Sequence, residues 1–163
     1  MILHIYTVIH TLISVIAIFT GLVVVFGMLA CKRLSGWTKW FLITAVATTL
    51  TGFFFPFHGF TPAIGLGIIS LPFLALTIYA RYPKQLVGAW RWIYAIGAVI
   101  CLYFNLFVLV VQAFEKVPAL HAMAPTQTEP PFKFTQLIVL LVSAMLAVVA
   151  AIRFHPAPRI ASD

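Results

Sequence analysis

Acidic side chains are nearly absent from this chain of 163 residues. Only three occur, Glu115, Glu129 and Asp163, and none of them falls within a long apolar run. Proton relays and cation pumps usually place carboxylates inside the membrane, so a proton- or sodium-coupled transporter is not expected. The sequence also lacks the two similar halves that an inverted-repeat transporter needs.

Charge of either sign is scarce as well, at 8% of residues, whereas 63% of residues are hydrophobic. A soluble domain usually carries about 25% charged residues, so this composition excludes an ordinary soluble domain. The length suits a single domain, residues 1–163, with one continuous core. We therefore expect an all-α integral membrane bundle.

Motifs for covalent or hydrolytic chemistry are missing. Cys31 and Cys101 form no CxxC or CxxCH motif, which leaves thioredoxin-like chemistry and covalent haem attachment without support. GxSxG, HExxH and paired carboxylates are absent too. These absences favour a protein that is not an enzyme.

What the sequence does contain is a series of five apolar runs. Each has the ~17–25 residues that a helix needs to cross the hydrocarbon core. The predicted spans are 5–30, 38–55, 62–80, 92–114 and 134–152. An alternative with four spans makes the third run, which contains glycine and proline, re-entrant. We disfavour it because it places the C-terminus outside and removes the charge bias described next.

Basic residues are distributed unevenly among the connections. Eight of the ten lie in alternate loops and the tail, and only Lys116 and Lys133 lie in the others. Because basic loops stay in the cytoplasm, we expect the N-terminus outside and the tail 153–163 in the cytoplasm. The four tryptophans flank the basic loops, as an interfacial aromatic belt does: Trp37, Trp40, Trp90 and Trp92. The net charge of +7 thus sets the topology, and nucleic acid is not an expected partner.

The outer loop, residues 115–133, has a pattern of its own. Pro118 suits the first position of a helix, and Val117, Leu120 and Met123 then repeat every three residues. This predicts a short interfacial helix. The pattern leaves open whether the loop covers a pocket or only connects two spans.

Polar residues within the spans recur at helical spacing and so share helix faces. We expect Tyr6, Asn105, Gln112 and Gln136, together with His10, to form a polar pocket that opens to the outer side. An unpaired amide is costly at the bilayer midplane, so Asn105 is expected to bond to the threonines of the second span. Packing between helices is the alternative explanation for all of these residues.

Histidine is the main candidate for ligand chemistry. The predicted topology puts His10, His58 and His121 on the outer side, where they would form a site for a transition metal. His10 and His58 would alternatively hold haem as a facing pair. The competing explanation is that histidines near a membrane interface are ordinary, because the ring is amphipathic.

Three stretches carry a family resemblance: GFFFPFHGFTPAIGLGIISL, GAWRWIY and YFNLFVLVVQAFEKVPALHAMAPTQTEPPF. They resemble a family of small bacterial multi-pass inner-membrane proteins with no established activity. A larger, more distant group carries histidines before its second and fourth spans, whereas LSGWTKW and LVGAWRW here contain none. The resemblance implies a location in the bacterial inner membrane.

Three functional hypotheses follow. The first is an accessory or scaffold subunit that contacts lipid and a membrane-protein partner or further copies of itself. The second is a protein that binds a metal or haem through the outer histidines. The third is an oligomeric channel or facilitator for a small uncharged solute, since five helices leave little room for a pore in one chain.

Overall fold

The computed structural model describes residues 2–56 and 62–155, and this part of the chain is helical with no strand. The all-α prediction is therefore confirmed. The helices are α1 (Ile2–Leu29), α2 (Ser35–Gly52), α3 (Pro62–Arg81), α4 (Trp90–Lys116), α5 (Pro118–Met123) and α6 (Pro130–Arg153). A short helix thus lies where the outer loop predicted one.

Four of these helices, α1, α3, α4 and α6, are long and apolar enough to cross a membrane. The predicted count of five is therefore met for four helices only. The remaining long helix, α2, has 18 residues and a length of about 27 Å at ~1.5 Å per residue. Its polar content sets it apart: five threonines, one serine and Lys39.

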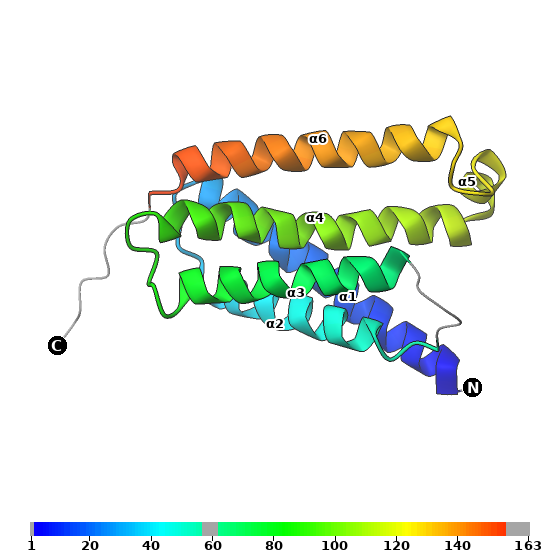
Figure 1. Ribbon diagram of the computed structural model, residues 1–163, viewed down its shortest axis with the longest axis horizontal. Helices are drawn as coiled ribbons and strands as arrows, with labels where there is room; N and C mark the ends of the chain where they lie inside the picture. Colours follow the sequence, from blue (N-terminus) through cyan, green and yellow to red (C-terminus); the bar gives the residue numbers. More distant parts are fainter. Residues whose placement is uncertain (1, 57–61, 156–163) are drawn as a thin grey trace.

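The helix α4 lies at the centre of the bundle (Figure 1). It contacts α1 and α3 on one side and α6 on the other, while α2 packs against α1 and α3. The helix α3 continues without interruption through Pro72 from Pro62 to Arg81, so the third run is not re-entrant as a broken helix would be.

Small residues allow α4 and α1 to approach their neighbours closely. A Cβ atom added to Gly97 of α4 would overlap the hydroxyl of Thr77 on α3. A Cβ atom on Gly21 of α1 would lie 2.8 Å from the ring of Phe41 and 2.9 Å from Leu102. Close packing over small residues is the usual way that membrane helices associate.

One end of the bundle, here called the basic end, contains the termini of α1, α2, α3, α4 and α6 that carry most of the cations. There Arg91 donates to the carbonyls of Ala151 and Phe154 at the end of α6. The last carbonyls of a helix have no partner within the helix, so such donors stabilise its C-terminus. The Lys84 ammonium lies 5.4 Å from the ring centroids of both Tyr79 and Trp90.

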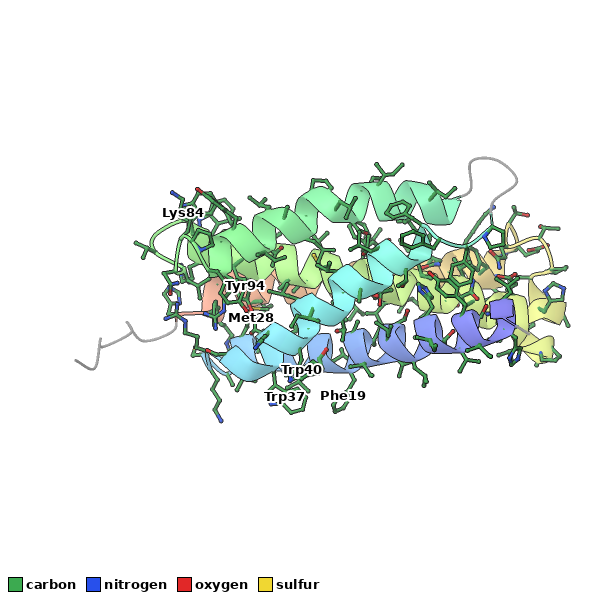
Figure 2. The ribbon with its side chains drawn as sticks, turned by 90° about the horizontal axis from the view of Figure 1, so that it is seen from below. Phe19, Met28, Trp37, Trp40, Lys84 and Tyr94 are labelled. Atoms are coloured by element: carbon green, nitrogen blue, oxygen red, sulfur yellow. The ribbon has the colours of Figure 1, made fainter. Side chains whose placement is uncertain are left out.

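Aromatic side chains surround the basic end on the outside of the bundle. Trp37 and Trp40 project from α2 near Phe19 of α1, and Lys84 lies at the extremity of the same end (Figure 2). The rings of Phe19 and Trp37 meet edge to face with centroids 6.0 Å apart. The opposite end, which carries α5, is called the α5 end below.

Candidate functional site

A cavity of about 340 Å³ lies between α1, α2, α3 and α4 in the half of the bundle nearer the α5 end. Its walls combine aliphatic and aromatic side chains with a small set of polar ones. The polar residues that line it are Thr7, His10, Thr11, Ser14, Thr48, Thr49, Ser70, Asn105, Gln112 and Lys116. This space is called the α1–α4 cavity.

The polar residues that α1 contributes to the cavity lining lie on one face of the helix because of their spacing in the sequence. Thr7 is followed by His10 and Thr11 three and four residues later, and Ser14 follows these two at four and three residues, so the four residues share one face of α1. That face meets α2 and α4, and the opposite face carries exposed Leu12, which suits contact with lipid.

The ring of His10 is fixed by contacts with α2 and the segment after it. Its Nδ1 atom lies 2.8 Å from the Thr51 hydroxyl, and its ring meets Phe55 edge to face with centroids 5.1 Å apart. The Tyr6 hydroxyl donates to the carbonyl of the same Thr51, and the Tyr6 ring also packs on Phe55. These contacts hold the first turns of α1 against the end of α2.

Asn105 lines the cavity as predicted but does not bond to the threonines of α2. Its amide group donates instead to the carbonyl of Cys101, one turn earlier in α4, at 2.9 Å. The prediction of an interhelical bond was therefore wrong, because α4 itself offers an acceptor within reach. The buried hydroxyl of Thr48 on α2 has no hydrogen-bond partner in the described part of the chain.

Of the four residues predicted to form the polar pocket, Asn105 and Gln112 line the cavity. Tyr6 lies beside it, bonded to Thr51 as described. Gln136 lies elsewhere: its amide donates to the Phe107 carbonyl of α4 at 3.2 Å, so it belongs to the contact between α4 and α6. Gln136 is a correction to the predicted pocket, since α6 supplies no residue to the cavity lining.

The contribution of α3 was missed by sequence reasoning. Ser70 lines the cavity, and Gly67 leaves room for the ring of Phe53, to which an added Cβ atom would come within 2.8 Å. Ser70 lies in the middle of a mostly apolar run that also contains Thr77, and this position is the signal that could have identified it.

No protein-family model, curated protein or solved structure matches this chain. The resemblance to small bacterial membrane proteins therefore stays a prediction.

The predicted metal site is not tested by the structure, because one of its three histidines lies outside the described residues. His10 lines the cavity, His121 is exposed on α5, and His58 lies outside the described residues. Within residues 2–56 and 62–155 no group of three His, Cys, Asp or Glu side chains is placed to hold a metal ion. A haem or metal site that depends on His58 stays a prediction.

Proposed function

We propose that the chain crosses the inner membrane of a bacterium five times, with its N-terminus outside and its C-terminus in the cytoplasm. The basic end supports this orientation, because it gathers the cationic loops and an external belt of tryptophans. The helix α2, which packs along α1 and α3, is the span that we add to the four more apolar helices, and it is second in chain order. The short α5 then lies at the outer interface, with Val117 and Met123 exposed.

Thiol labelling tests this topology. Cys31 is exposed at the basic end and Cys101 is buried. A membrane-impermeant maleimide is expected to label Cys31 only after cells are permeabilised. In a Cys31→Ser background, a cysteine introduced by Ala122→Cys on α5 is expected to react in intact cells. Labelling of the introduced cysteine only after permeabilisation would contradict this topology. With the N-terminus outside, four crossings before residue 122 place it outside, whereas a cytoplasmic residue 122 requires an odd number of crossings.

Within this topology, we propose that the protein binds a small, uncharged amphipathic molecule in the α1–α4 cavity. The cavity is the observation that carries the proposal. Its volume of about 340 Å³ falls within the range of roughly 300–1,000 Å³ typical of small-molecule sites. Apolar walls with a few convergent polar groups are the usual lining of such sites.

The charges around the cavity exclude cations as its preferred occupants. Among the residues that the structure describes, its lining contains no carboxylate, and the one formally charged residue there is Lys116, the last residue of α4. A cationic ligand would have to leave water without a counter-charge, which is costly in a low-dielectric setting. A neutral molecule avoids that cost.

The other hypotheses receive less support from the geometry. The exposed apolar faces that an accessory subunit would use, such as Leu137, Leu141 and Met145 on α6, are satisfied by lipid alone. A channel needs a continuous path to the basic end, where Phe41, Leu102 and other buried side chains fill the interior. A binding site closed at the basic end fits the structure better than a pore.

Photolabelling tests the binding proposal. Protein in nanodiscs is exposed to octanol carrying a diazirine on its chain, or to the methyl ether of this probe, and the labelled residues are mapped by mass spectrometry. We expect saturable labelling of cavity residues by at least the alcohol. Ser70→Phe fills the cavity and is expected to reduce this labelling to background.

Leu141→Phe is the matched control, since it adds the same ring to the exposed face of α6. It is expected to leave cavity labelling unchanged. Labelling that does not saturate, or that survives Ser70→Phe at the level of the control, would overturn the proposal.

A further inference from the structure

Of the six described hydroxyl groups that line the α1–α4 cavity, four already use their protons within their own helices, whereas that of Thr48 has no partner in the described part of the chain and keeps a proton to donate. Ser14 donates to the carbonyl of His10 at 2.8 Å, and Ser70 donates to that of Leu66 at 2.7 Å. Thr49 and Thr7 make the same bond to carbonyls four residues earlier, each at 2.9 Å. A hydroxyl has a single proton but two lone pairs, so each of these four groups offers the cavity only an acceptor.

The contacts of His10 fix its tautomer so that this ring, too, offers the cavity an acceptor. The Thr51 hydroxyl donates its proton to the Ala47 carbonyl at 2.6 Å, so it can only accept from the imidazole. The proton of a neutral His10 must therefore lie on Nδ1, 2.8 Å from the Thr51 oxygen. The Nε2 atom of this cavity-lining ring is then a lone-pair acceptor.

Each side-chain amide of the lining has two N–H groups and one carbonyl oxygen, so it adds both a donor and an acceptor. Asn105 uses an amide N–H on Cys101, and Gln112 uses one on Glu115 at 3.2 Å. The carbonyl oxygen of Asn105 accepts no such bond within residues 2–56 and 62–155, and it lies on a residue that lines the cavity. The strongest donor, the Lys116 ammonium, lies at the α5 end of α4 and not beside Ser70 or Ser14 along the bundle.

We infer that the ligand of the α1–α4 cavity is a hydrogen-bond donor: a neutral amphiphile with an alcohol or phenol hydroxyl. This inference rests on the proposed binding function and specifies its ligand class. A ligand hydroxyl would donate its proton to one of these acceptors, such as the Ser14 or Ser70 oxygen or Nε2 of His10. An ether or ketone can accept from the donors of the lining, such as the Thr48 hydroxyl, but it has no proton for these acceptors and leaves them unpaired, whereas a hydroxyl can serve both.

A competition experiment tests this preference. The diazirine-bearing octanol labels wild-type protein in nanodiscs, and 1-decanol or its methyl ether is added as competitor. Competitor concentrations are expressed per membrane lipid, so that differences in partitioning cancel. We expect 1-decanol to reach half-maximal competition at a concentration about fivefold lower than its ether, as one net hydrogen bond predicts. Equal competition by both compounds would overturn the inference.

Thr51→Val tests the contribution of the His10 hydrogen bond to ligand preference separately from that of cavity shape. The substitution nearly preserves volume, keeps the backbone carbonyl that Tyr6 uses, and removes the acceptor that fixes His10. We expect the preference for alcohol over ether to fall while the ether competes as in wild type. In wild type, ¹⁵N NMR of His10 is expected to show a protonated Nδ1 and a bare Nε2, and a protonated Nε2 would contradict the inference.

The two proposals fail in different ways. If neither diazirine probe labels the cavity, the binding function itself is wrong. If both label it saturably and the two competitors are equivalent, binding stands and only the ligand class is wrong.

Discussion

Gly97→Ala is expected to lower the free energy of unfolding by about 1–3 kcal/mol, the usual cost of overpacking a filled core. The added Cβ atom would overlap the hydroxyl of Thr77, which is fully buried on α3 and bonded to the Phe73 carbonyl at 2.6 Å. Either Thr77 gives up that bond or α3 and α4 move apart. Reversible unfolding in mixed micelles, followed by far-UV circular dichroism, measures the loss.

Two variants make this test specific. Gly36→Ala adds the same methyl group at a position with nothing within 4 Å, so we expect no loss of stability there. Thr77→Ala removes the overlapping oxygen, and in combination with Gly97→Ala it is expected to restore part of the lost stability. The packing described here would be contradicted if Gly97→Ala were as stable as Gly36→Ala.

Tyr94→Ala is expected to cost about 3–5 kcal/mol, as loss of a large buried ring usually does. Tyr94 is 2% exposed and meets the Phe154 ring at a centroid distance of 5.8 Å. The guanidinium of buried Arg81 lies 5.8 Å from the Tyr94 ring centroid, so the substitution also removes a cation–π contact. The same unfolding measurement applies.

Tyr94→Phe is the control that keeps the ring. It removes only the hydrogen bond between the Tyr94 and Thr38 hydroxyls, which lie 3.1 Å apart, and is expected to cost about 1 kcal/mol. Because Tyr94 does not line the α1–α4 cavity, Tyr94→Phe should bind the photolabel as wild type does. Equal losses for the two variants would show that the ring is not a core residue.

The helices were predictable from the sequence because their signals are local. The run predicted at 92–114 corresponds to α4, Trp90–Lys116, and Pro118 marked the start of α5. The case of α2 was harder, since its threonines bond to its own carbonyls and so look more polar in the sequence than they are in the helix. Spacing along a helix identifies a face, and this placed His10 correctly beside the cavity.

Spacing does not identify the helix that a face meets. Gln136 and Asn105 have similar sequence surroundings, yet one lies between α4 and α6 and the other lines the cavity. The choice depends on how the helices cross, which close contacts such as Gly97 with Thr77 determine. The same limit applies to Ser70, because the other polar residues that line the cavity lie on α1, α2 and α4.

The position of α6 has a consequence for how the protein is made. The described residues that line the α1–α4 cavity lie between Thr7 and Lys116, and α6 joins the bundle mainly through α4. During synthesis, the four helices that form the site are translated before α6. The lining of the site is therefore complete without α6, which is joined to α4 by the bonds of Arg91 to the carbonyls at its end.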